Sequence, residues 1–247
     1  MRFVRPRINL GLTLVDGSRV IVDSGNYTNV RFIIQEVYGQ EVYEKDYRVK
    51  PGSSVVDVGA NVGIFAIKAA REVGRDGSVL AIEPASNAFA KLNRNIALNR
   101  LDNIRAVRCA AGADAGEGLL FIKRWGDGNS TFCETPEHTI RKENVPIQRL
   151  DEIVRVAGLK RCDFLKIDTE GAELEVLKGA RSLLAESRPE VAIETHAFGS
   201  KAEDVIDFLK SFGYSAKYQS NTSFTHTDSG YVYGRSANLA TRSSATI

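Results

Sequence analysis

The chain has 247 residues, of which 43% are hydrophobic and 26% are charged, and it carries a formal net charge of +2. These fractions exclude disorder for most of the chain, and the length favours one α/β domain. The small net charge gives no support to a nucleic-acid or membrane partner. No apolar run reaches the length of a membrane span, and no signal-peptide stretch follows the basic residues 1–7. The sequence therefore predicts a cytoplasmic protein.

The first part of the chain is predicted to cover the domain that follows. Residues 8–23 alternate apolar and polar side chains around an Asp-Gly pair, which is a strong signal for a β-hairpin. Thr28 is a suitable N-cap for a helix that runs to Tyr38. We expect residues 1–50 to form this hairpin and helical cover over the ligand cleft of a domain at residues 51–235.

Strand and helix patterns alternate over the next part of the chain. Short apolar runs are followed by longer segments whose apolar residues have helical spacing. Two strand–helix–strand units of this kind imply a parallel sheet with helices on both faces. Such sheets bind ligands at the carboxyl ends of their strands. The predicted elements are strand 53–58, helix 63–74, strand 78–83, helix 86–99 and strand 104–109.

Residues 55–63, Val-Val-Asp-Val-Gly-Ala-Asn-Val-Gly, predict a buried strand that turns through glycines into a helix. Glycine allows a tight turn and lets a ligand lie against the backbone, and the helix directs unpaired N–H groups at that ligand. The glycine spacing of a dinucleotide site fails, because Asn61 and Ile64 occupy its second and third positions. Asp57 would also repel a pyrophosphate. A ligand that carries a positive charge suits this turn better.

A second acid, Glu83, ends the next predicted strand and is followed by Pro84. S-adenosyl-L-methionine carries a sulfonium and an ammonium group, a carboxylate for the helix N-terminus, and two ribose hydroxyls for a second acid. The pattern therefore predicts this molecule as the cofactor, with Asp57, Glu83 and Pro84 in its site. The turn residues assigned to the same site are Gly59, Ala60, Asn61, Val62 and Gly63.

The alternation then breaks over residues 113–148, which are predicted to be a substrate-specific insertion, because loops on a rigid scaffold often carry specificity. Strands are predicted at 119–123 and 145–149, with a turn-rich loop at 124–130. Trp125 in this loop is interpreted either as a stacking surface for a ligand or as a buried anchor, and the anchor is favoured.

The rest of the chain returns to the alternating pattern. The last two predicted strands are expected to include an antiparallel hairpin, and the polar residues 236–247 predict a flexible tail. The predicted elements are helix 150–157, strand 163–168, a helix opened by residues 169–173, strand 191–194, helix 201–212, and strands 215–219 and 231–234.

Two blocks, residues 59–63 and residues 166–173 (Lys-Ile-Asp-Thr-Glu-Gly-Ala-Glu), resemble the FkbM family of S-adenosylmethionine-dependent methyltransferases. The resemblance covers most of the chain from residue 38 to residue 215. Further blocks follow the pattern of that family in the same order, namely Tyr43-Glu44, Lys50-Pro51-Gly52, Leu150-Asp151 and Val176-Leu177-Lys178-Gly179.

The resemblance implies a class I methyltransferase, Rossmann-like α/β fold, in which a seven-stranded, mostly parallel sheet has helices on both faces. It also implies O-methylation of a hydroxyl on a sugar, glycolipid or polyketide-like acceptor, so the expected partner is a small molecule or a glycan. Glu44 is placed among the cofactor-binding residues. One departure is Ala110-Ala111, where many class I enzymes carry an acid that reads the adenine amino group. Backbone groups at Ala110 and Ala111, together with the packing of Ile82 and Pro84, would then contact the adenine.

Four polar residues are predicted to converge at the catalytic end of the cleft. Lys166 and Asp168 share one face of a strand, as do Glu194 and His196 at the end of the next. His196 is the first candidate for the base that deprotonates the acceptor, because its unperturbed pKa is near neutrality. Asp168 could orient the hydroxyl, balance the sulfonium or act as the base itself. Lys166 is interpreted as a buried cation paired with an acid.

Simpler interpretations stand beside this catalytic one. Glu170 and Glu173 fit the first turn of a helix, where the helix dipole favours acids, and His196 could be an ordinary loop histidine. Alternatively, Asp168, Glu170, Glu194 and His196 could hold Mg²⁺, which prefers oxygen ligands, although nothing in their spacing demands a metal.

Two other functions compete with an O-methyltransferase. A nucleic-acid base methyltransferase usually carries an Asn/Asp-Pro-Pro-aromatic run after the fourth strand, whereas this chain has Asp-Thr-Glu-Gly at residues 168–171. No basic, aromatic-rich patch supports nucleic-acid binding either. A non-catalytic S-adenosylmethionine-binding module is disfavoured, because both predicted cofactor acids and a histidine at the fifth strand end are present.

Overall fold

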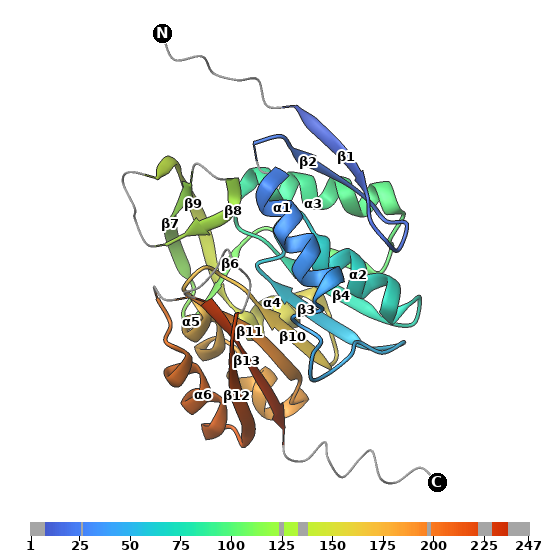
Figure 1. The fold of residues 1–247 in the computed structure, drawn as a ribbon. Helices are drawn as coiled ribbons and strands as arrows, with labels where there is room; N and C mark the ends of the chain where they lie inside the picture. The colour runs from blue at the N-terminus through green and yellow to red at the C-terminus, as the bar shows by residue number, and fades with distance from the viewer. Residues whose placement is uncertain are drawn as a thin grey trace.

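A computed structural model describes residues 8–25, 27–123, 126–132, 138–196, 199–221 and 229–236. Its centre is a seven-stranded sheet with the strand order β12-β13-β11-β10-β3-β4-β5 (Figure 1). Strands β11, β10, β3, β4 and β5 run parallel, and β13 runs antiparallel to β11 and β12. The predicted mostly parallel sheet is therefore confirmed. Its strands are β3 (Ser54–Val58), β4 (Ser78–Ile82), β5 (Ile104–Val107), β10 (Phe164–Ile167), β11 (Glu190–His196), β12 (Tyr214–Ser220) and β13 (Ser229–Ser236).

Helices cover both faces of this sheet, because successive side chains of its central strands point to opposite sides. The helices are α2 (Ile64–Val73), α3 (Ser86–Asn99), α4 (Leu150–Ala157), α5 (Glu173–Lys178) and α6 (Ala202–Ser211). Val55 and Val79 pack with α2 and α3 on one face. Their neighbours Val56 and Leu80 pack with α4, α5 and α6 on the other (Figure 1). The core thus lies in two layers, one on each side of the sheet.

The predicted N-terminal hairpin is confirmed, and it docks on α3. Its elements, and those that follow it, are β1 (Asn9–Thr13), β2 (Arg19–Asp23), α1 (Tyr27–Ile34) and a π-helical turn, η1 (Gln35–Gly39). The side-chain amide of Asn95 accepts the N–H of Ile21 at 2.7 Å, and that of Asn99 accepts the N–H of Arg19 at 2.8 Å. Two asparagines of α3 therefore satisfy backbone groups of β2.

The predicted insertion contributes to a second sheet of four strands with the order β6-β9-β7-β8. These strands are β6 (Ala110–Gly112), β7 (Gly116–Lys123), β8 (Gly126–Thr131) and β9 (Thr139–Arg149). Strand β8 corrects the prediction of a turn-rich loop at residues 124–130, since it pairs antiparallel with β7. Backbone hydrogen bonds suffice for an edge strand, so this stretch forms one without an apolar alternation.

Three predictions concern residues outside the described part of the chain: the basic segment 1–7, the role of Trp125, and the flexible tail at residues 237–247. The tail was predicted to begin at Ser236, but Ser236 ends β13 and is buried, so the prediction is corrected at this residue. Among the helices that the structure describes, none is both long and apolar enough to cross a membrane.

Gly59 sets the contact between the end of β3 and the end of β10. Its φ is +79°, in the left-handed region that favours glycine. A Cβ added here would lie 1.7 Å from the carbonyl oxygen of Asp168. Glycine is therefore required, and the turn after β3 lies directly against the residue that follows β10.

Replacing Gly59 by alanine tests this contact. We expect Gly59→Ala to lower the free energy of unfolding by about 3 kcal/mol or more, because left-handed strain and a backbone clash add together. Gly158→Ala is the matched control, since Gly158 has a φ of +76° but nothing within 4 Å of the added Cβ. Its loss should be about 1 kcal/mol. Equal losses in urea denaturation would show that the contact with Asp168 is unimportant.

Candidate active site

A cavity opens at the carboxyl ends of β3, β4, β10 and β11. Phe32 and Ile33 of α1 and Glu36 of η1 form part of its wall. Several residues that the sequence assigned to the site also line this cavity. They are Gly59, Ala60, Asn61, Glu83, Pro84, Ala110, Ala111, Lys166, Asp168, Glu194 and His196.

Glu83 joins the two turns at one end of the cavity. One carboxylate oxygen accepts the N–H of Asn61 at 2.8 Å, and the other accepts the N–H of Ala85 at 2.8 Å. A carboxylate has about four acceptor positions, so these two bonds do not exhaust its capacity. The carboxylate is thus held in one orientation while it can still accept hydrogen bonds from hydroxyl groups of a ligand.

Val62 and Gly63, predicted to bind the cofactor, lie outside the cavity wall. The Val62 side chain is buried in the core beside α2, and Gly63 packs against Leu92. The chain turns away from the cavity after Asn61 in order to enter α2. The direct cofactor contact assigned to these two residues is therefore corrected.

Glu44 also lies away from the cavity wall. Its carboxylate forms an ion pair with Lys68 of α2 and accepts the N–H of Val49 at 3.2 Å. The side chain of Glu44 is only 3% exposed. Because a buried ammonium needs a partner, Glu44 neutralises Lys68 instead of facing a ligand. The cofactor contact that the family resemblance implied for Glu44 is corrected.

Asp57 is fully buried beneath the glycine turn and contacts Lys166 instead of a ligand. The distance from Asp57 Oδ1 to Lys166 Nζ is 3.0 Å. Lys166 Nζ also donates to the Gly59 carbonyl at 2.9 Å and lies 3.6 Å from Asp168 Oδ2. Burial alone would lower the pKa of Lys166, but Asp57 and Asp168 outweigh it and raise the pKa. Lys166 is the buried, paired cation that the sequence predicted, and it joins β3, β10 and the turn.

Tyr43 holds two carboxylates together at the opposite end of the cavity. Its hydroxyl lies 3.1 Å from Asp168 Oδ2 and 3.0 Å from Glu194 Oε2. Burial raises the pKa of Glu194 well above its ordinary value, and Asp168 adds to the shift. Glu36 lines this end too, and Tyr231 donates a hydrogen bond to it at 3.3 Å. Sequence reasoning missed Glu36, whose only signal was an acid inside an apolar helical run.

His196 ends β11 among three carboxylates. Its Nε2 lies 3.8 Å from Glu170 Oε2 and 3.9 Å from Glu194 Oε1, and its Nδ1 lies 3.5 Å from Glu173 Oε1. Burial lowers the pKa of His196, but Glu173, Glu170 and Glu194 outweigh burial and raise the pKa to about 10. These surroundings do not favour the predicted base role, because an imidazolium cannot accept a proton.

Glu170 lies between β10 and α5 with a φ of +55°, a conformation that non-glycine residues rarely adopt. It therefore precedes the helix, which begins at Glu173, and the prediction of Glu170 in the first helical turn is corrected. The Thr131 hydroxyl of β8 donates to the Glu170 carbonyl at 2.8 Å. Burial raises the pKa of the Glu170 carboxyl to about 7. Backbone strain and a shifted pKa both occur preferentially at functional sites.

Comparison with known proteins identifies the family. Residues 57–216, which are more than half of the chain, match the family model described as the methyltransferase FkbM domain. The chain belongs to the FkbM methyltransferase family. The family membership predicted from the blocks at residues 59–63 and 166–173 is confirmed. Residues of both blocks line the cavity, and Lys166 of the second block donates a hydrogen bond to Gly59 of the first.

Three relatives illustrate the range of this FkbM family. Methyltransferase sdnD of Sordaria araneosa is 31% identical over 74% of this chain and 81% of its own length. The 31-O-demethyl-FK506 methyltransferase FkbM of Streptomyces tacrolimicus is 24% identical over 85% of this chain and 91% of its own length. The hexuronic acid methyltransferase AglP of Haloferax volcanii is 28% identical over 74% of this chain and 70% of its own length.

Solved structures show the same fold. The crystal structure of methyltransferase FkbM from Methylobacillus flagellatus matches with a TM-score of 0.55 and 19% identity, over 86% of this chain and 55% of that one. Aeropyrum pernix fibrillarin with bound S-adenosyl-L-methionine matches with a TM-score of 0.51 and 16% identity, over 94% of this chain and 96% of that one. The FkbM-family chain therefore has the class I methyltransferase fold.

Removing the Lys166 ammonium tests its structural role. We expect Lys166→Met to cost about 3–5 kcal/mol of unfolding free energy, because Asp57 would remain buried without its partner. Adding Asp57→Asn should recover much of that loss, since the unpaired charge is then gone.

Lys178→Met is the control for this prediction. It removes an exposed ion pair with Glu175 and should cost about 0–1 kcal/mol. Urea denaturation gives the unfolding free energies of the wild type, Lys166→Met, the double variant with Asp57→Asn, and Lys178→Met. A Lys166→Met loss no larger than that of the control would refute the structural role.

Proposed function

We propose that this FkbM-family chain binds S-adenosyl-L-methionine at the Glu83 end of its cavity and methylates a hydroxyl oxygen held at the Asp168 end. The observation that supports this proposal most directly is that one cavity contains two different ends. At one end, the Glu83 carboxylate is held in a fixed orientation beside a glycine turn, and at the other, carboxylates cluster at the ends of β10 and β11. The first feature suits a nucleoside, and the second suits a hydroxyl that loses a proton.

The residues at the Glu83 end fit this cofactor chemically. Glu83 can accept from both ribose hydroxyls, and Pro84, Ala110 and Ala111 offer a small, mostly apolar wall and backbone groups to the adenine. Asp168 lies across the turn, where a carboxylate stabilises a positive sulfonium. When bound, S-adenosyl-L-methionine supplies an electrophilic methyl group.

The opposite end fits an acceptor with several hydroxyls, such as a sugar, a glycolipid headgroup or a polyketide-like molecule. Asp168, Glu170, Glu194 and Glu36 are hydrogen-bond acceptors that line it. In the transfer, the acceptor O–H bond breaks and a carboxylate of this end takes the proton. The oxygen forms the new bond to the methyl carbon as the carbon–sulfur bond breaks, and the electron pair of that bond stays on sulfur. The names of two relatives, one for a demethyl-FK506 substrate and one for hexuronic acid, support this class of acceptor.

We also propose that the second sheet, built largely from residues 113–148, selects the acceptor. Leu120 and Phe132 line the cavity, and Thr131 holds the strained Glu170. The nucleic-acid alternative gains no support from the family match or from these relatives' names.

Calorimetry with S-adenosylhomocysteine tests the cofactor site. We expect Glu83→Ala to weaken binding by about 1–3 kcal/mol, because the ribose hydroxyls lose a charged acceptor. Glu143→Ala is a matched control, since Glu143 also accepts a backbone N–H near the start of α3, from Ser86 at 3.0 Å, but does not line the cavity. Its affinity should equal that of the wild type.

Two results would contradict the assignment. One is an unchanged affinity in folded Glu83→Ala. The other is displacement of S-adenosylhomocysteine by micromolar NAD(H), which the altered glycine spacing disfavours.

A further inference from the structure

The Asp168 end of the cavity brings together side chains of the types that bind metal ions. One ligand atom each from Asp168, Glu194 and His196 lies within 4.8 Å of the other two. The strands that carry them are adjacent and parallel, with Ile167 opposite Ile193, so all three residues leave the sheet at the same edge. Tyr43 contacts one oxygen of each carboxylate, which leaves Asp168 Oδ1 and Glu194 Oε1 to face a ligand.

The spacing around the imidazole suits a shared ion better than direct hydrogen bonds. His196 Nε2 lies 3.8 Å from Glu170 Oε2 and 3.9 Å from Glu194 Oε1. Hydrogen bonds of this type are about 2.7–3.2 Å long. Two ligand atoms that each bind one ion at about 2.1 Å lie roughly 3–4 Å apart, and His196 Nε2 and Glu194 Oε1 lie at this spacing.

The other imidazole nitrogen is oriented as it is in metal-binding histidines. His196 Nδ1 faces Glu173 Oε1 at 3.5 Å, and the Glu173 side chain is completely buried. The same Glu173 oxygen accepts the N–H of Gly171 at 2.9 Å, so the carboxylate cannot turn away. A carboxylate behind Nδ1 directs Nε2 into the site and raises its basicity, as outer carboxylates do for metal-ligating histidines.

We propose that Asp168, Glu194 and His196 bind one hard divalent cation of the magnesium and manganese class at the acceptor end of the cavity. Two carboxylates and one imidazole match the ligand preference of such ions, which also keep open positions for water or substrate oxygens.

The cation gives the acceptor end a chemical role that rests on the proposed methyl transfer. An acceptor hydroxyl beside the ion becomes more acidic, because the positive charge stabilises the oxygen as its proton leaves. Glu170 lines the same cavity near His196 Nε2 and takes that proton. The oxygen then forms its bond to the methyl carbon as the carbon–sulfur bond breaks, and both electrons of that bond remain on sulfur. His196 is in this case a ligand and not the base: it binds the ion as a neutral imidazole, so the ion takes the place of the proton that the surrounding carboxylates favour when no ion is bound.

Binding of Mn²⁺ alone tests the site without an activity assay. Chelator-treated protein is titrated with MnCl₂, and free Mn²⁺ is followed by electron paramagnetic resonance. We expect one Mn²⁺ per chain, displaced by excess Mg²⁺, and a loss of affinity of at least about tenfold in Asp168→Asn and in His196→Gln. Glu173→Gln should lose about 10–100-fold while leaving all three ligands in place.

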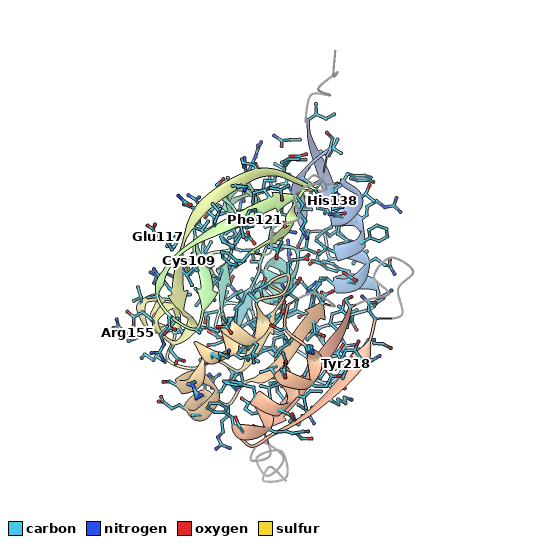
Figure 2. All side chains as sticks on the ribbon, turned by 90° about the vertical axis from the view of Figure 1, so that its left-hand side faces the viewer. Cys109, Glu117, Phe121, His138, Arg155 and Tyr218 are labelled. Atoms are coloured by element: carbon cyan, nitrogen blue, oxygen red, sulfur yellow. The ribbon has the colours of Figure 1, made fainter. Side chains whose placement is uncertain are left out.

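His138 and Glu117, both labelled in Figure 2, lie at the second sheet and do not line the cavity. The variants His138→Gln and Glu117→Gln are therefore matched controls. Both should bind Mn²⁺ like the wild type. Circular dichroism identifies a variant that fails to fold, and the wild-type titration alone remains decisive. Absence of bound Mn²⁺ in the wild type at millimolar concentration, with and without S-adenosylhomocysteine, would overturn the proposal.

Calorimetry with S-adenosylhomocysteine on the same samples separates the two proposals. Cofactor binding without Mn²⁺ binding overturns the cation site and leaves the methyltransferase proposal intact. Equal Mn²⁺ affinity in the ligand variants and in the controls would also overturn the site.

Discussion

The buried ammonium of Lys166 holds the strand ends that make up the active site in register. It lies between Asp57 on β3, the carbonyl of Gly59 in the turn and Asp168 after β10. A lone charge at this depth would be very unfavourable, so these groups stay together or the site unfolds. Because Gly59 also lies directly against the Asp168 carbonyl, the cofactor end and the acceptor end of the cavity cannot shift independently. A fixed distance between donor and acceptor is what methyl transfer requires, since its rate depends on alignment.

The acceptor end concentrates carboxylates in a buried environment. Four carboxylates line this end of the cavity, namely Glu36, Asp168, Glu170 and Glu194. The ammonium group of Lys166 lines the same cavity. Burial raises the pKa values of Glu170 and Glu194, and repulsion by the nearby carboxylate of Asp168 adds to both shifts. Glu170 additionally has a left-handed backbone that costs stability. Features that lower stability persist where they serve function, and here a sulfonium, an acceptor hydroxyl and a divalent cation would each benefit from the charge.

Much of the fold follows from the sequence because burial leaves a local trace. Strands covered on both faces read as continuous apolar runs, and the glycine turn and Glu83 could be located from them. The details that failed depend on tertiary contacts. Asp57 was assigned to a ligand because its position at a strand end did not reveal that Lys166 lies beneath it. Strand β8 has no apolar alternation, and its pairing with β7 is not visible in the local sequence.

The chemistry of the site was harder to predict than its position. His196 was chosen as the base from its unperturbed pKa, but three carboxylates from different segments surround it. Glu36 reaches the cavity from a segment far away in sequence, carried there by the hairpin and α1. Local patterns therefore indicate which strand ends meet, whereas the charge state of the groups depends on neighbours that only the folded chain brings together.

Transfer of a labelled methyl group from S-adenosyl-L-methionine to pooled acceptors tests the central claim most directly. Sugars, glycolipids, polyketide-like alcohols and RNA are offered in parallel, and the labelled product is identified by mass spectrometry. We expect the label as a methyl ether on a hydroxyl compound, with none on RNA. We also expect no transfer by Asp168→Ala that still folds and binds S-adenosylhomocysteine. Label on RNA, or none on any hydroxyl compound while S-adenosylhomocysteine binds, would contradict the claim.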